Sequence, residues 1–173
     1  MQAFVFNTRR EIFKDRILDN EPERGDIIVF KTPSDNRTDY IKRLIGLPGD
    51  EISIKDGRLW INKKEIPTQQ MADFVEKKEN QGPLKSIPRC SNSPVALEAN
   101  CLKSQFIEKI TDQLEVKVLD ISSGEYGDNT TSFKVPEGEF FFLGDNRDNS
   151  LDSRFGRMAG AVSYTHLTLP TKA

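Results

Sequence analysis

The sequence predicts a mainly β fold built from antiparallel sheets. Its apolar residues form short runs between turn signals, as at Ile27–Phe30 and Phe140–Leu143, and they lack the long periodic pattern of a helical bundle. Eleven glycines and nine prolines in 173 residues supply frequent breaks between these runs. The pair Asp56-Gly57, set between alternating apolar and polar residues, is a strong two-residue hairpin signal. The length suits one domain with a modest core.

Composition disfavours several classes of function. The net charge is −2 and the two signs are interspersed, so nothing indicates a nucleic-acid surface. No run of about eighteen apolar residues is present, so no membrane-spanning helix is expected within the sequence. The only histidine is His166, which disfavours both a Ser-His-Asp triad and a histidine-ligated metal site. A hydrolytic base would then have to be a lysine, a carboxylate or a tyrosine.

Two strands are predicted in the first third of the chain. Ile27–Lys31 begins with a continuous apolar run, which is typical of a strand buried on both faces. Tyr40–Ile45 forms the second, and Gly46–Asp50 is a strong turn signal after it. The two strands are expected to pair as a hairpin across a polar loop.

Lys42 lies within the second of these strands. Because successive strand side chains point to opposite faces, Lys42 shares a face with Tyr40 and Leu44. A lysine between two such residues can lose water, which lowers its pKa and allows the neutral amine to act as a general base. Spacing alone favours the other interpretation, a lysine at a strand edge whose head reaches water.

The remaining elements are predicted in order. Glu51–Ile66 is expected to form a meander around the Asp56-Gly57 turn. Residues 67–111 are hydrophilic and are interpreted as an inserted, variable subregion. Leu114–Ile121 alternates as a strand, and Phe140–Leu143 is expected to be a buried one. The charged segment Gly144–Arg154 follows this strand directly and predicts a constrained polar loop.

Cys90 and Cys101 flank a polar, proline-containing segment. In an oxidising compartment they would close a small disulfide loop, and otherwise they are two unrelated thiols. The sequence leaves both alternatives open.

Three blocks, in this order, resemble the signature boxes of bacterial type I signal peptidase: Arg24–Phe30, Asp39–Asp50 and Gly144–Arg154. The resemblance runs with gaps from about Glu23 to about Val162. It implies antiparallel sheets of the Ser-Lys protease type and a membrane-associated serine endopeptidase that removes signal peptides from exported preproteins. It also implies a catalytic domain on the periplasmic or outer face of the bacterial inner membrane, with no nucleic-acid partner and no metal or organic cofactor.

The resemblance assigns roles to individual residues. Lys42 occupies the place of the general base, and Ser150 that of the serine which hydrogen-bonds and orients the lysine. Small-residue pockets for the substrate are expected at Val29, Tyr40 and Ile41. Structural support is expected from Arg43, Gly144, Asp145, Asp152 and Arg154, with Asp152 and Arg154 as an ion pair.

The sequence departs from the family pattern at both ends. No serine precedes Ser34, whereas the family's nucleophile lies upstream of the Arg24 block, in a Ser-Met-x-Pro-like box after one or more membrane anchors. The chain is therefore expected to be a partial catalytic domain over residues 1–162, with 67–111 as its insert and without activity alone. Residues 163–173 match nothing in the family and are interpreted as a non-native tail.

Two other functions remain to be weighed. One is another Ser-Lys protease with a related β core, such as a self-cleaving repressor domain, and the Gly144–Arg154 block argues against it. The other is a non-catalytic, β-rich binding module that retained the motifs.

Overall fold

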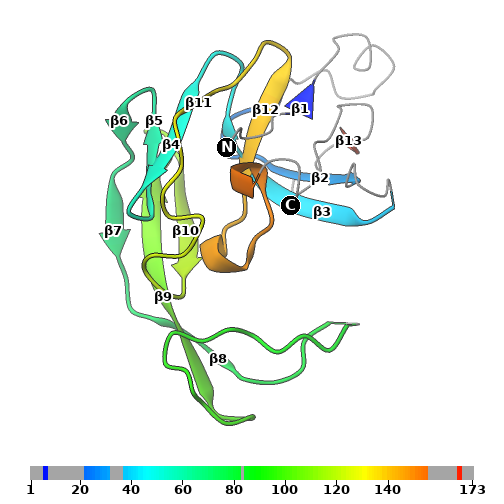
Figure 1. Cartoon of the computed structure of the whole chain (residues 1–173), viewed down its shortest axis with the longest axis vertical. Coiled ribbons are helices and arrows are strands. Elements are labelled where there is room, and N and C mark those ends of the chain that lie inside the picture. The colour runs from blue at the N-terminus through cyan, green and yellow to red at the C-terminus, as the bar shows by residue number, and fades with distance from the viewer. Residues whose placement is uncertain (1–5, 8–21, 32–36, 83, 156–166, 169–173) are drawn as a thin grey trace.

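The computed structural model describes residues 6–7, 22–31, 37–82, 84–155 and 167–168. In these ranges the chain forms three sheets whose paired strands are antiparallel (Figure 1). The predicted mainly β, antiparallel fold is therefore confirmed. None of the helices in the described ranges is long and apolar enough to cross a bilayer.

The first sheet has five strands and contains the segments that surround Lys42. Its strand order is β1-β12-β3-β2-β13. The bounds are Phe6–Asn7 for β1, Ile27–Lys31 for β2, Asp39–Gly46 for β3, Glu139–Leu143 for β12 and Leu167–Thr168 for β13. The predicted strands over 27–31, 40–45 and 140–143 thus lie in one sheet, and β2 and β3 pair as expected. Of the predicted tail, only β13 is described.

The other two sheets have four strands each. One has the order β11-β4-β5-β6, and in the other β10, β9 and β7 are neighbours while β8 also pairs with β9. The strands of the former are β4 (Glu51–Lys55), β5 (Arg58–Ile61), β6 (Lys64–Glu65) and β11 (Phe133–Lys134). Those of the latter are β7 (Thr68–Gln70), β8 (Phe74–Lys77), β9 (Asn100–Lys109) and β10 (Glu115–Asp120). Asp56 and Gly57 join β4 to β5 with φ of 48° and 74°, as a two-residue turn requires.

Hydrophobic clusters lie on both faces of the first sheet. Neighbouring residues of a strand point to opposite faces, so Leu44 and Ile45 enter different clusters. Leu44 joins the smaller cluster, which also holds Ile28, Phe30, Phe140 and Phe142. Ile45 joins the larger one, together with Phe141, Leu143 and apolar residues of β4, β5 and β10. The packing therefore fixes β3 from both sides, and with it the direction of Lys42.

Strand β2 is less buried than its sequence predicts. Ile28 and Phe30 are buried, but the side chain of Ile27 is 50% exposed and Val29 is only partly buried. The prediction of burial on both faces was wrong at these two positions. The apolar run contains no polar residue to mark the outer face, so the pattern could not distinguish the two arrangements.

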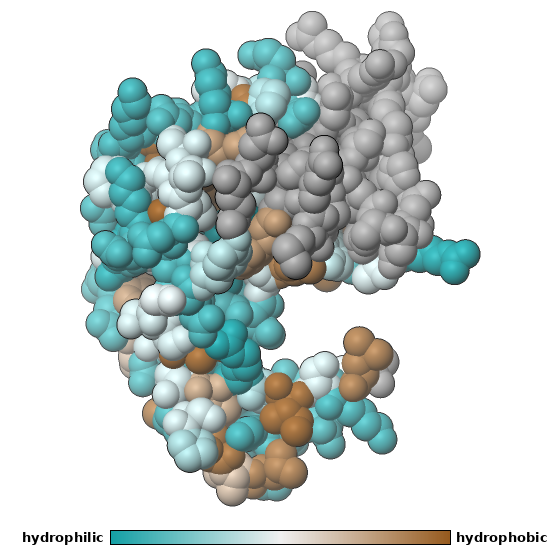
Figure 2. All heavy atoms as spheres, viewed as in Figure 1, coloured by the Kyte–Doolittle hydropathy of each residue, from teal (hydrophilic) through white to brown (hydrophobic). Residues whose placement is uncertain are grey.

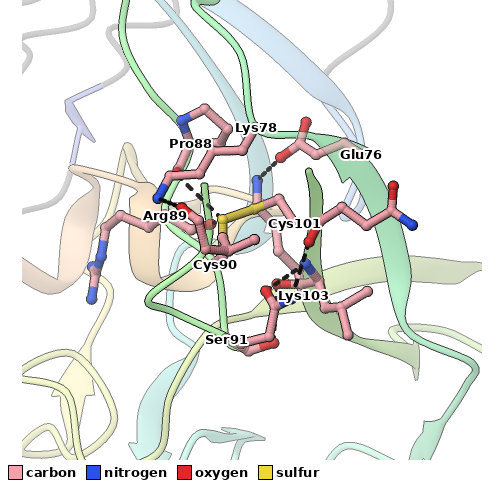
Figure 3. Close-up of a disulfide and its surroundings, with 12 residues drawn as sticks. Glu76, Lys78, Pro88, Arg89, Cys90, Ser91, Cys101 and Lys103 are labelled. Atoms are coloured by element: carbon pink, nitrogen blue, oxygen red, sulfur yellow. Dashed lines mark hydrogen bonds and ion pairs between the residues drawn. A yellow bond between two sulfur atoms is a disulfide. The ribbon is translucent and has the colours of Figure 1, made fainter. Parts of the chain in front are cut away.

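Residues 67–111 contain β7, β8 and the ten-residue β9, none of which the sequence predicted. Cys90 and Cys101 form a disulfide that ties the loop after β8 to β9, beside the ion pair of Lys103 and Glu76 (Figure 3). Figure 1 shows β8 and this loop extending away from the rest of the sheets. Figure 2 shows a notch between this arm and the body, and the exposed large apolar residues of the arm include Phe74, Val75, Leu84 and Ile87.

Candidate active site

Lys42 lies on β3 on the face that Leu44 and the smaller hydrophobic cluster occupy. Its partner on β2 is Ile28, which is 2% exposed. The Nζ atom is 5.0 Å from the centroid of the Tyr40 ring, so the predicted arrangement of these two side chains on one face is observed. Lys42 itself is partly buried.

Burial lowers the pKa of Lys42, because it removes water from the ammonium. The negative charges of Asp152 and Asp145 raise this pKa and the positive charge of Arg154 lowers it, and the net effect is a lowered pKa. The Tyr40 ring attracts a cation and therefore opposes the effect of burial. The neighbouring charges that act on the pKa of Lys42 thus come from the segment Gly144–Arg154, which is far away in the sequence.

The segment Gly144–Arg154 is a tightly bonded loop that contains the 3₁₀ helix η2 (Arg147–Asn149). The side chains of Asp152 and Arg154 form an ion pair with Nε···Oδ1 of 2.8 Å, and they are 0% and 2% exposed. Oδ2 of Asp152 also accepts a hydrogen bond of 3.0 Å from the Gly144 amide. The Arg154 guanidinium donates to the carbonyl of Arg147 at 2.5 Å. These bonds close the loop on itself.

Gly144 and Ser150 are in close contact within this loop. A Cβ atom on Gly144 would lie 2.1 Å from Ser150 Oγ, so only glycine leaves room for the hydroxyl. Leu143 is opposite Arg43, the neighbour of Lys42, and Asp152, which binds the Gly144 amide, acts on the pKa of Lys42. The fold therefore brings charged residues of the loop that contains Ser150 within electrostatic range of Lys42, although the loop is about a hundred positions away in the sequence.

Ser150 Oγ is buried, and among the described residues it has no hydrogen-bond partner. The hydrogen bond between Lys42 and Ser150 that the resemblance implies is thus not formed in this structure. A buried hydroxyl without a partner is unusual. It leaves a buried hydroxyl that can still donate or accept, within the loop whose charges act on Lys42.

Arg43 connects the turn before β2 to the loop after β12. Its guanidinium binds both carboxylate oxygens of Asp145, at 2.8 and 2.7 Å, and donates to the carbonyl of Gly25 at 2.7 Å. Since Arg43 follows Lys42 directly, its side chain leaves the opposite face of β3. Asp145 is 42% exposed and Arg43 13%, so this bidentate pair lies at the edge of the loop.

The three predicted substrate residues divide between two faces. Val29 and Ile41 are opposite each other on β2 and β3 and therefore share one face of this strand pair. We call it the outer face, because Ile41 is 64% exposed on it. Tyr40 lies on the other face with Lys42. Val29 and Ile41 are therefore brought together, and Tyr40 is separated from them by the sheet.

Sequence reasoning missed one buried pair that contacts the loop. Arg147 of η2 and Glu108 of β9 form a bidentate ion pair, with side chains 8% and 2% exposed. Glu108 lies between Phe106 and Ile110 in the sequence, two residues from each. An acidic residue at the centre of an apolar alternation is a signal of a buried carboxylate that needs a partner.

The arrangement suits proton transfer by an amine. It combines a partly dehydrated lysine, a buried hydroxyl and a loop whose own charges are paired. Within the part of the chain that the structure describes, no three His, Cys, Asp or Glu side chains are grouped to bind a metal ion.

Comparisons with known proteins agree with the three sequence blocks. The family model described as signal peptidase, peptidase S26, matches residues 3–168. The signal peptidase I of Rickettsia canadensis (strain McKiel) is 43% identical over 143 residues, which are 83% of this chain and 48% of that protein. The signal peptidase I of Rickettsia bellii (strain OSU 85-389) is also 43% identical over 143 residues, or 83% of this chain and 44% of that protein. The chain thus spans about half the length of these curated relatives.

A similar solved structure is the crystal structure of a signal peptidase I from Enterococcus faecalis V583. It is 27% identical, the match covers 78% of this chain and 86% of that one, and the TM-score is 0.38.

Proposed function

Because the chain belongs to the signal peptidase family, peptidase S26, we propose that the whole protein containing it is a membrane-associated serine endopeptidase that removes signal peptides from exported preproteins. The observation that carries the proposal is the position of Lys42. It is partly buried on β3, its pKa is lowered by that burial, and the loop that interacts with it contains the buried hydroxyl of Ser150.

The proposed reaction is acyl transfer with Lys42 as the general base. A serine hydroxyl of the whole protein attacks the scissile carbonyl, and neutral Lys42 accepts its proton. The resulting ammonium returns the proton to the leaving amine, and an acyl-enzyme remains. Lys42 then takes a proton from water as the hydroxide attacks the ester, and the ammonium returns that proton to the departing serine oxygen, which regenerates the serine and the neutral amine. A lowered pKa supports this role, because a lysine at about 10.4 would be almost fully protonated at neutral pH.

Ser150 is proposed to orient the amine. Its hydroxyl accepts a hydrogen bond from Lys42 without adding charge, once the bound substrate and the nucleophile close the site. Gly144 supports this role because it gives Ser150 the space it needs. The ion pairs of Asp152 with Arg154 and of Arg43 with Asp145 hold the loop and are proposed to be structural.

The substrate is proposed to bind as an added strand, with main-chain hydrogen bonds for affinity and small pockets for specificity. Val29 and Ile41 are proposed to line these pockets from the outer face of the strand pair, and Tyr40 to act from the side of Lys42. The site is proposed to face the periplasm or the outer side of the inner membrane, where exported preproteins emerge.

The test is a cleavage assay with the whole protein and a preprotein substrate. Lys42→Ala should lower kcat by about 10³-fold or more, because general-base catalysis typically contributes 10²–10⁴-fold. Ser150→Ala should lower kcat by roughly tenfold, the effect of one orienting hydrogen bond. Lys117→Ala, at an exposed lysine of β10, is the matched control and should leave kcat unchanged. Full activity of Lys42→Ala would remove the lysine from the mechanism.

A further inference from the structure

The loop that contains Ser150 has an anchor outside the sheet of Lys42. Glu108 of β9 is 1% exposed, and its two carboxylate oxygens accept hydrogen bonds from both terminal nitrogens of Arg147, one of them at 2.7 Å. The charge of Glu108 counters the burial of Arg147 and raises its pKa, so Arg147 stays a cation. The anchor therefore joins β9, within residues 67–111, to η2.

A continuous set of bonds leads from this anchor to the neighbours of Lys42. The carbonyl of Arg147 accepts from the Arg154 guanidinium, which pairs with Asp152. Asp152 in turn accepts from the amide of Gly144, against which Ser150 packs. Asp152 and Arg154 are also charges that act on the pKa of Lys42. A shift of Arg147 would therefore reach both the hydroxyl and the charges at the lysine.

Stability does not explain why this pair is ionic. Replacing a buried ion pair by apolar residues of similar volume is often neutral or stabilising. A bidentate pair, however, sets a single orientation of the guanidinium. The ion pair thus contributes geometry that an apolar pair of the same size would not supply.

We propose that Glu108 is a positioning residue for the cleavage reaction: it holds Arg147, and through Arg154 and Asp152 it holds Ser150 and the charges around Lys42 in their working geometry. This inference rests on the proposed function. It gives residues 67–111 a part in catalysis, although the sequence suggested a variable insert there.

Other contacts keep η2 in place when Glu108 is changed. Oδ2 of Asp148 accepts from the amides of Ile121 and Ser122 at 3.0 and 2.9 Å, and Arg89 donates to the Asp148 carbonyl at 2.9 Å. Beside the ion pair is a cavity of about 200 Å³, and its other charged lining residues are Asp56, Arg58 and Asp120. Loss of Glu108 should therefore alter the loop locally and leave the fold intact.

The experiment compares Glu108→Gln with Glu76→Gln in the whole protein. Glu76 of β8 forms a buried pair with Lys103 of β9 at 2.5 Å. Its described partners are Lys103 and Gln81 and not η2, so it controls for loss of a charge pair that involves β9. Glu108→Gln should lower kcat about tenfold and change KM less than about twofold. It should also move the acid limb of the pH profile to higher pH, because Asp152 without a fixed Arg154 raises the pKa of Lys42. Glu76→Gln should change neither.

The double variant E108L/R147M separates positioning from stability. It removes both charges and so leaves no unpaired charge buried. Its unfolding temperature should therefore lie within about 2 °C of the wild-type value, while kcat stays low. Recovery of kcat together with stability would overturn the proposal, as would equal kinetics of Glu108→Gln and Glu76→Gln.

A measurement without substrate covers the case in which the wild-type protein does not cleave preproteins. Amide hydrogen exchange of the 173-residue chain should be at least tenfold faster at Gly144 and Arg154 in Glu108→Gln, and unchanged there in Glu76→Gln. Unchanged exchange in both variants would overturn the positioning role independently of the proposed function.

Discussion

The behaviour of Lys42 depends on a balance between burial and nearby charge. Burial destabilises its ammonium, whereas the Tyr40 ring and the carboxylates of Asp152 and Asp145 stabilise it. Arg154 offsets Asp152 because the two form a buried pair. The paired charges act weakly at a distance, so burial decides the direction and the pKa is lowered.

Asp120 illustrates the opposite case at the end of β10. Burial raises its pKa to about 6, and the neighbouring carboxylates of Asp148 and Asp128 add to this effect. The folded protein therefore binds a proton more tightly than the unfolded chain does. The stability from this group is complete below pH 4 and is lost as the pH rises through about 6.

Asp120→Asn should consequently stabilise the protein above pH 6 and have no effect near pH 4. A pKa unit corresponds to about 1.4 kcal/mol, and solvent screening of this partly exposed carboxyl should reduce the gain to about 1 kcal/mol. Urea unfolding of both proteins at pH 4 and pH 8 measures the difference. A gain that is equal at the two pH values would show that Asp120 does not titrate between them.

At the scale of elements, β9 links the arm to the candidate active site. Its first half pairs with β8 and carries Cys101, and its second half pairs with β7 and β10 and carries Glu108. The disulfide fixes Cys90 in the loop. The preceding residue, Arg89, donates a hydrogen bond to the Asp148 carbonyl. One strand thus supports both the exposed arm and η2.

Removing the disulfide by Cys90→Ala/Cys101→Ala should lower the free energy of unfolding. The two cysteines are 11 positions apart, and the chain-entropy relation gives about 3 kcal/mol for a loop of that length. Urea unfolding should show this loss, and wild type under reducing conditions should show the same. Equal stability of the oxidised and the double-alanine proteins would mean that the bridge does not constrain the unfolded chain.

At the scale of the whole molecule, the sequence predicted the elements with clear patterns. The Asp56-Gly57 turn and the strands around Lys42 were predicted because turn residues bound their apolar runs. β9 was missed because its buried positions change phase: Cys101 and Lys103 are buried in its first half, and Glu108 in its second. A period of two residues is lost when a twisted strand buries opposite faces along its length.

The candidate site was predictable only in part. The strand alternation placed Lys42 beside Tyr40, but it left the choice between base and surface lysine to the family resemblance. Glu108 could not be assigned because its partner Arg147 lies 39 residues away. Tyr40 and Ile41 fall on opposite faces by strand alternation alone, whereas the position of Val29 opposite Ile41 follows from the register of β2 and β3, which the sequence does not specify.

The most direct test of Lys42 as a base is its own titration. The ¹³Cε signal of Lys42 in the isotopically labelled protein, assigned with Lys42→Arg, reports its protonation as a function of pH. The midpoint should lie clearly below about 10.4, the value of a free lysine side chain, because burial lowers this pKa. A midpoint at or above that value would contradict the account, since the amine would then remain protonated where the reaction needs a base.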